Sequence, residues 1–277
     1  MSMYIPTGSL VSFFSSGFPS HVRAKAIDVS SPDFHTFYSP VEGEVIDTEK
    51  IRVGRPNRFA EVDYDYVILI RQSNGNMVKI LHVRPFTEKG EYVKEGQPLG
   101  EFILTPYTGG DFPHAHIEGV RISFPKISMY RESLRGIIKV KTRDYFDVMI
   151  EDYAQAGKFR GLGCCGGLLN ASIPYACYGG LIGGYKEPIS LFGIHLGKIY
   201  RKRKNYAIFE GKRGLIRNWE FDSSFKVLEN KPICGKAFME VVLSYGGFPY
   251  IRFFSSTAME EGDLIDLRSV ILKGFNH

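Results

Sequence analysis

The strongest constraint on the fold is a strand, turn, strand pattern in the first half of the chain. Tyr64–Ile70 is rich in strand formers, Asn74-Gly75 is a tight turn signal, and Met77–Val83 is a second run of strand formers. Asn-Gly between two such runs is typical of an antiparallel hairpin, because a two-residue hairpin turn needs residues that tolerate positive φ. The sequence therefore predicts a β-hairpin over residues 64–83.

The rest of the chain is also predicted to be mainly β. Residues from about 10 to 142 contain further strand signals such as Val41–Ile46. The second half contains short aromatic and β-branched runs, including Tyr206–Phe209 and Phe238–Leu243. We therefore expect two β-rich domains, since 277 residues can bury more than one core.

A helical segment is expected to separate the two domains. Phe146, Met149, Ile150 and Tyr153 recur at the spacing of one helix face within residues 144–156. We therefore predict one domain over residues 1–142 and a second β-rich domain of unassigned role over 143–277, opened by a helical linker.

Composition indicates an ordinary globular protein. Hydrophobic residues make up 44% and charged residues 23% of the chain, and the net charge is +5. This mild basic excess is too small to indicate nucleic acid or an anionic surface by itself. No run is long and apolar enough to span a membrane, and the first residues do not resemble a secretory signal. A cytoplasmic location is expected.

The cysteines all lie in the second half of the chain. They are Cys164, Cys165, Cys177 and Cys234, and no pair has the C-x-x-C spacing. We interpret them as reduced thiols of a cytosolic protein. A disulfide or a cysteine metal site in the second half remains an alternative.

A His-x-His-x-Glu motif is the main chemical signal. In an extended backbone His114, His116 and Glu118 point to one face and the residues between them to the other. Two imidazoles and a carboxylate on one face can supply a metal ligand, an acid/base group and a partner that orients a ring. Five of the seven histidines fall within the first 116 residues. The motif therefore marks the first domain as the candidate site.

Two further residues are candidates in the same domain. Asp28 stands between Ile27 and Val29 in a strand-like run, and a buried carboxylate needs an ion pair or a metal. His82 ends the strand-like run that contains Val78 and Ile80 and is expected on their apolar face. By itself such a histidine is more often a core or edge residue than a catalytic one.

The order of these segments resembles the lysostaphin-type zinc endopeptidases. The resemblance runs from about His21 to Glu118. It is carried by an early His and Asp, the turn at residues 39–45, a strand that ends in His82, the Val-Lys-Glu-Gly-Gln turn at 93–97, and His114-Ala115-His116. It implies a compact antiparallel β-sandwich, the duplicated hybrid motif, for the first domain.

The resemblance also implies the site residues. His21, Asp28 and His116 match the zinc ligands, and His82 and His114 match the catalytic pair. Three protein ligands leave one coordination position of zinc open to water, as hydrolytic sites require. The implied function is a zinc-dependent hydrolase that cleaves a peptide or amide bond in a peptide-like substrate. Glu118 is a candidate to orient a ring N–H.

One spacing departs from the family pattern. The family usually has its first His four residues before the Asp, but Ala24 occupies that place and His21 precedes Asp28 by seven residues. An odd spacing puts the two side chains on opposite faces of a regular strand. A loop or bulge within residues 22–25 is therefore required, or His35 replaces His21 as the ligand.

Other interpretations remain open. A non-catalytic binding module on the same scaffold fits the altered spacing and the absence of an export signal. A nucleic-acid-binding role for the second domain could use Arg201–Lys204, although such a run is more often a solvated turn or the protected edge of a sheet. A dinucleotide site at Gly161-Leu162-Gly163-Cys164-Cys165-Gly166 is rejected, because that pattern needs a strand before it and a helix after it, whereas a helix-like segment precedes it and further glycines follow. The sequence leaves the oligomeric state open.

Overall fold

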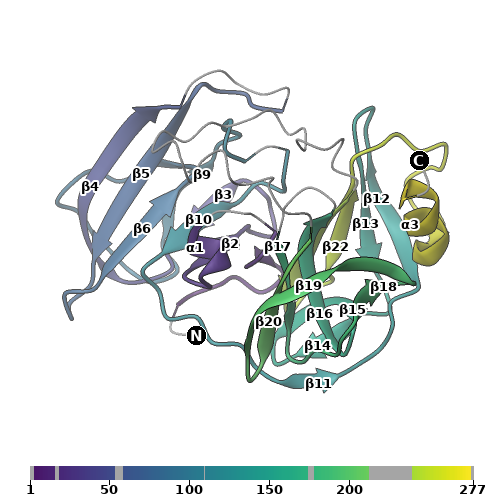
Figure 1. Cartoon of the computed structure of the whole chain (residues 1–277). Coiled ribbons are helices and arrows are strands. Elements are labelled where there is room, and N and C mark those ends of the chain that lie inside the picture. The colour runs from purple at the N-terminus through teal and green to yellow at the C-terminus, as the bar shows by residue number, and fades with distance from the viewer. Residues whose placement is uncertain are drawn as a thin grey trace. The chain divides into compact units, whose positions relative to one another are not determined.

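The structure, a computed structural model, describes residues 3–15, 19–53, 59–108, 110–173, 178–211 and 239–275. Strands dominate these residues, and the register of their pairings is antiparallel (Figure 1). The predicted mainly β, antiparallel class is confirmed. Helix within the described residues is restricted to α1 (Pro19–Val22) and α3 (Leu267–Phe275). No helix in that part of the chain is long and apolar enough to cross a membrane.

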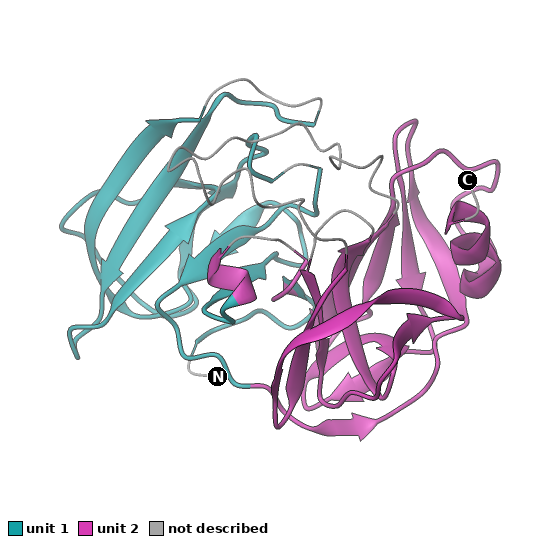
Figure 2. Cartoon of the chain, in the orientation of Figure 1, with its two compact units in different colours: residues 1–11, 23–123, 225–230 teal, residues 12–22, 124–224, 231–277 magenta. Residues whose placement is uncertain are grey.

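The chain divides into two compact units (Figure 2). Unit 1 contains residues 1–11 and 23–123, and unit 2 contains residues 12–22, 124–224 and 231–277. The division after residue 123 precedes the expected boundary at residue 142, and the short segment 12–22 groups with unit 2.

Unit 1 contains two antiparallel sheets. Neighbouring strands of the larger sheet are, in order, β8 (Tyr92–Val93), β4 (Gly43–Arg52), β5 (Tyr64–Arg71), β6 (Met77–Leu81), β10 (Ala115–Glu118), β2 (Ala26–Val29) and β1 (Leu10–Ser12). The smaller sheet consists of β3 (Thr36–Tyr38), β9 (Pro98–Phe102) and β7 (Val83–Pro85). The predicted hairpin is confirmed as β5 and β6, with Gly75 at a φ of 83° in the turn.

The larger sheet of unit 1 has one apolar face. Ile68, Ile80 and Ile117 are register partners across β5, β6 and β10, and all three are fully buried. Because side chains alternate along each strand, the residues between them point to the opposite face. That opposite face carries the candidate site.

Unit 2 is built from the remaining strands. They are β11 (Ile127–Met129), β12 (Arg135–Lys141), β13 (Phe146–Ile150), β14 (Ala154–Ala156), β15 (Phe159–Cys164), β16 (Gly167–Ile173), β17 (Tyr178–Ile182), β18 (Ile189–Leu191), β19 (Ile194–Arg203), β20 (Tyr206–Glu210), β21 (Met239–Tyr245), β22 (Tyr250–Phe253) and β23 (Leu264–Asp266). Their inward residues form one apolar cluster, which α3 joins through Leu267 and Ile271. The predicted strands at 206–209 and 239–243 are confirmed, and residue 238 lies outside the described residues.

The predicted helix over residues 144–156 is wrong. Phe146, Val148 and Ile150 alternate with Asp147 and Met149 and form β13, and β14 follows at residues 154–156. Positions 146 and 150 satisfy both a period of four and a period of two. Pairing of β13 with β12 and β22 selects the strand, because it buries the three even-numbered side chains in the apolar cluster.

Gly119, which directly follows β10, offers a direct test of how closely the end of β10 approaches β6. A Cβ at Gly119 would lie 2.0 Å from the carbonyl oxygen of Met77, and the φ of Gly119 is +87°. Gly75 has a similar φ of +83° but nothing within 4 Å of its Cβ position. We expect Gly75→Ala to lower the free energy of unfolding by about 1 kcal/mol. Gly119→Ala should cost about 1–3 kcal/mol more, because the strands must separate.

Urea denaturation of the two variants measures this difference. Equal losses for Gly75→Ala and Gly119→Ala would show that backbone conformation alone, and not the contact between β10 and β6, determines the need for glycine at residue 119.

Candidate metal centre

The centre of the site is a pair of residues on adjacent strands. Asp28 on β2 and His116 on β10 are register partners, so their side chains leave the sheet on the same face. Oδ1 of Asp28 and Nδ1 of His116 lie 2.9 Å apart, and both residues are buried. Ile27 and Val29 are buried as well, and the alternation directs them to the other face. The predicted strand Asp thus has the orientation that a ligand at this site needs.

Glu118 is bonded to the second ring nitrogen of His116. Its Oε1 lies 3.0 Å from Nε2 of His116, and Nζ of Lys79 lies 3.1 Å from the same oxygen. Burial by itself would lower the pKa of His116, but the bonds to Asp28 and Glu118 outweigh it and raise the pKa to about 9. The bond to His116, followed by the charge of Lys79, lowers the pKa of Glu118 to about 2 despite partial burial. Glu118 therefore orients His116, as its position on the same face predicted.

A helical turn and a left-handed residue bring His21 toward this pair. His21 lies in α1, and Ala24 has a φ of +55° before β2 begins at Ala26. The segment between His21 and Asp28 is therefore not a regular extended strand, so the odd spacing does not force the two side chains to opposite faces. The required loop within residues 22–25 is present without glycine.

His21 is itself held by the backbone. Its Nδ1 lies 2.8 Å from the carbonyl oxygen of Phe13, and the side chain is buried. A carbonyl accepts only, so Nδ1 carries the proton and Nε2 is the nitrogen with the lone pair. This arrangement of one ring nitrogen on a carbonyl is typical of metal-ligating histidines.

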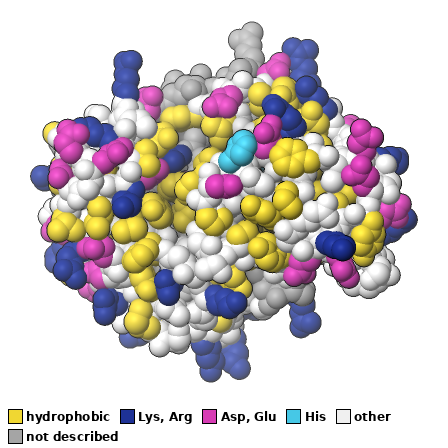
Figure 3. Space-filling view, turned by 180° about the vertical axis from the view of Figure 1, so that it is seen from behind, with side chains coloured by type: hydrophobic (Ala, Val, Ile, Leu, Met, Phe, Trp, Pro, Cys, Tyr) yellow, Lys and Arg dark blue, Asp and Glu magenta, His cyan; other side chains and the backbone are white. Residues whose placement is uncertain are grey.

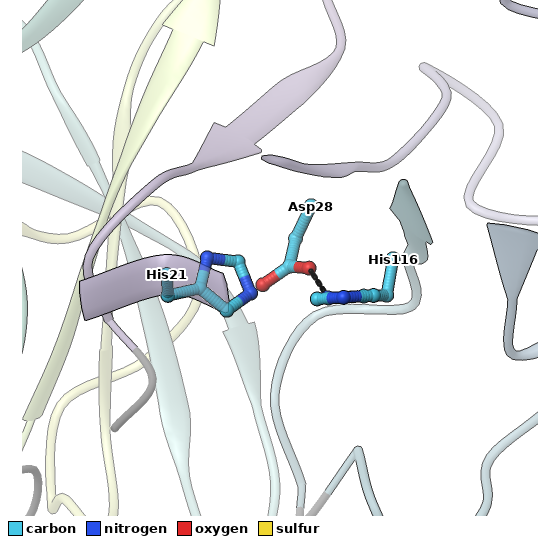
Figure 4. Close-up of side chains that lie close together, drawn as sticks. All are labelled: His21, Asp28 and His116. Atoms are coloured by element: carbon cyan, nitrogen blue, oxygen red, sulfur yellow. Dashed lines mark hydrogen bonds and ion pairs between the residues drawn. The ribbon is translucent and has the colours of Figure 1, made fainter. Parts of the chain in front are cut away.

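His21, Asp28 and His116 together form a group that could hold a metal ion (Figure 4). One ligand atom from each lies within 4.8 Å of the others. Ligands on a tetrahedral zinc lie about 2.0–2.2 Å from the ion, which places them roughly 3.4 Å apart. Asp28 and His116 are already closer than this, at 2.9 Å, and the upper limit of 4.8 Å exceeds the tetrahedral separation by about 1.4 Å. Two imidazoles and a carboxylate suit zinc.

His35 does not take the place of His21. Its side chain is 70% exposed, and its Nε2 lies 3.8 Å from the carboxylate of Glu101. Within the described residues His21, Asp28 and His116 are the group with metal-ligand geometry.

His82 is presented to the site by a left-handed backbone conformation. Its φ is +68° directly after β6, so it leaves the alternation that places Val78 and Ile80 in the core. The expectation that His82 shares their apolar face is therefore wrong. Its ring bonds to Asp65 instead, with Nδ1 2.6 Å from Oδ2, and its backbone N–H donates to Oδ1 of Asp65 at 2.9 Å.

His114 lies beside His82. Their ring centroids are 5.5 Å apart, and the rings of His82 and His116 are 6.2 Å apart. Nδ1 of His114 donates to the carbonyl oxygen of Phe112 at 2.7 Å, which leaves Nε2 as the acceptor. Desolvation lowers the pKa of His114 to about 4. The structure therefore brings His82 and His114 together next to the ligand group.

Two residues at the site were not predicted. The carboxylate of Asp65 is fully buried against His82, and the ring of Tyr107 lies 6.1 Å from that of His82. A carboxylate within the strand-forming run of residues 64–70 was a signal for Asp65, because burial of an acid requires a partner. Tyr107 lies in a turn region and carried no periodic signal.

Comparisons with known proteins add a family match. Residues 4–131 match a family described as "Domain of unknown function (DUF8155) N-terminal domain". A search of curated proteins found no match. A solved structure described as "Structure of the SpoIIQ-SpoIIIAH pore forming complex" has 16% identity and a TM-score of 0.28, and the alignment covers 44% of this chain and 89% of that one.

The bond between Asp65 and His82 determines which ring nitrogen of His82 faces the site. In wild-type protein the carboxylate accepts from Nδ1–H, so neutral His82 has its lone pair on Nε2. In Asp65→Asn the side-chain N–H₂ can replace that acceptor, and we expect a shift to the Nε2–H tautomer. Nitrogen-15 NMR of the histidine rings measures the tautomer.

The matched control is Asp63→Asn, which changes a half-exposed carboxylate near the start of the same strand. A tautomer that is unchanged in Asp65→Asn would contradict the assigned role of Asp65.

Proposed function

We propose that this protein is a zinc-dependent hydrolase similar to the lysostaphin-type endopeptidases, and that it cleaves a peptide or amide bond. The observation that carries the proposal is the grouping of His21, Asp28 and His116, with His82 and His114 beside His116. These five side chains come from four segments of the sequence, since only His114 and His116 belong to the same motif. A purely structural role does not require them to gather at one place.

The ligand roles follow from the donor atoms. Nε2 of His21, a carboxylate oxygen of Asp28 and Nδ1 of His116 would hold the ion, with Glu118 bonded to the second nitrogen of His116. A zinc ion held by these residues would supply a water of lowered pKa and a Lewis acid for the scissile carbonyl. Glu118 keeps His116 in the ligating orientation, in the way that second carboxylates commonly support metal histidines.

The remaining histidines supply proton transfer. Nδ1–H of His114 is bonded to a carbonyl and Nδ1–H of His82 to Asp65, so both neutral rings have Nε2 as their acceptor. One Nε2 can accept the proton of the attacking water, and a protonated ring can donate to the leaving amine. The buried carboxylate of Asp65 lies 2.6 Å from Nδ1 of His82 and fixes the orientation of that ring. We assign His82 and His114 as the acid/base pair.

The nucleic-acid alternative has less support. The run at residues 201–204 ends β19 and enters the turn to β20, where most of its side chains are exposed, as expected for a solvated turn. On the face shown in Figure 3, basic side chains are interspersed with acidic ones. Such mixing disfavours binding of a polyanion at that face.

Metal content tests the ligand assignment. We expect purified protein to bind one zinc per chain, and His116→Ala and Asp28→Asn each to weaken binding by at least about 100-fold, because a site with two protein ligands holds zinc poorly. His35→Ala is the matched control and should bind zinc as wild type does. Elemental analysis and titration with a chelating dye measure these affinities. Protein that binds no zinc after dialysis against the metal would contradict the proposal.

Turnover tests the acid/base pair separately from the metal. His114→Ala should retain zinc yet lower hydrolysis of a quenched fluorescent peptide library by about 100-fold or more, since a positioned proton-transfer group contributes about that much. His195→Ala, an exposed histidine of β19, is the control and should leave the rate unchanged. Zinc binding without hydrolysis of any peptide in the library would favour a binding module on the same scaffold.

A further inference from the structure

The turn between β15 and β16 has an unusual residue at its centre. Cys164 and Gly167 are register partners, and the two residues between them, Cys165 and Gly166, have φ values of +49° and +81°. Positive φ at both central positions is the conformation of a hairpin turn that favours Asn-Gly or Gly-Gly. A cysteine at the first position accepts a conformational cost that Asn or Gly would reduce.

The two adjacent sulfurs are directed toward each other. Sγ of Cys164 and Sγ of Cys165 lie 3.3 Å apart. Cys164 is buried and Cys165 is partly exposed. The two thiols are therefore in contact, and Cys165 is the one that a reagent in solution can reach.

The backbone of Ser190 holds the pair in place. Its N–H donates to Sγ of Cys165 at 3.2 Å, and its carbonyl oxygen lies 3.3 Å from Sγ of Cys164 and 3.0 Å from Sγ of Cys165. The carbonyl faces both sulfurs, so the difference between them comes from the donors, because the N–H of Ser190 and the thiol of Cys164 are both aimed at Sγ of Cys165 and favour its thiolate form. The bond from Cys164 is the main cause that lowers the pKa of Cys165 to about 6, and the bond to Cys165 together with burial raises the pKa of Cys164. The geometry thus separates an accessible nucleophile from a buried second thiol.

We propose that Cys164 and Cys165 form a redox-reactive dithiol that a low-molecular-weight disulfide converts into a disulfide between adjacent residues. The Cys165 thiolate attacks one sulfur of the reagent, which forms a mixed disulfide and releases one thiolate. Cys164 then loses its proton to solvent and attacks the Cys165 sulfur, which expels the second thiolate. The two cysteines lose two electrons and two protons, and the reagent becomes two thiols.

The product should be readily reversible. Adjacent Cα atoms are about 3.8 Å apart across a trans peptide, which is shorter than the usual separation in disulfides of about 4.4–6.8 Å. Strained disulfides have more oxidising potentials and are easily reduced. This site is separate from the proposed metal centre and does not depend on it.

The experiment uses the full chain with Cys177→Ser and Cys234→Ser, so that only the pair remains. Folded protein is incubated with oxidised glutathione near neutral pH, and the reaction is quenched with acid. Intact mass spectrometry then measures the mass of the protein. We expect a product lighter than the reduced protein by two hydrogen atoms, which dithiothreitol restores. Cys164→Ser in this background should instead accumulate a stable glutathione adduct. The reaction of Cys165→Ser with oxidised glutathione should be at least roughly tenfold slower than that of Cys164→Ser, because its remaining thiol is buried and protonated.

Each other outcome overturns the proposal. A stable glutathione adduct on the protein that retains both cysteines would show that Cys164 does not attack. No reaction in the folded protein, with normal reaction in urea, would show that the pair is inert. Urea denaturation of each variant confirms that it is folded before the comparison, and Cys164→Ala replaces Cys164→Ser if the serine variant does not fold.

Discussion

The bond between Asp28 and His116 is the interaction on which the candidate site depends. Antiparallel pairing of β2 and β10 places the two residues opposite each other. Burial of the neighbouring pair Ile27 and Ile117 in the core fixes that register. A slip of one residue in either strand would turn the polar side chain of that strand toward the apolar core. The packing of the sheet therefore determines the position of the ligands, and Glu118 adds the orientation of the ring.

Two left-handed residues complete the arrangement. Ala24 turns the chain so that His21 approaches Asp28, and His82 leaves its strand to meet Asp65. Neither conformation is favourable for a residue with a Cβ. Backbone strain of this kind is found most often at functional sites. The altered spacing in the sequence is thus accommodated by local conformation and does not disrupt the ligand group.

Local patterns predicted part of this structure, and pairing determined the rest. The Asn-Gly turn predicted the hairpin of β5 and β6, and the alternation of His116 and Glu118 predicted their common face, because both depend on neighbouring residues alone. Phe146 and Ile150 fit two periods, and only their partners on β12 and β22 select a strand. The contact between Asp65 and His82 could not be predicted from the sequence, since it depends on the positive φ of His82. Long-range pairing is not encoded in a single short window.

Zinc-edge X-ray absorption of the zinc-loaded chain tests the central claim most directly, because it reports the atoms that surround the ion. The proposed zinc site predicts two imidazole nitrogens and one carboxylate oxygen from His21, His116 and Asp28 at about 2.0–2.2 Å, with an oxygen of water as the fourth ligand. Coordination by oxygen alone, or by the sulfur of Cys164 or Cys165 at about 2.3 Å, would contradict it.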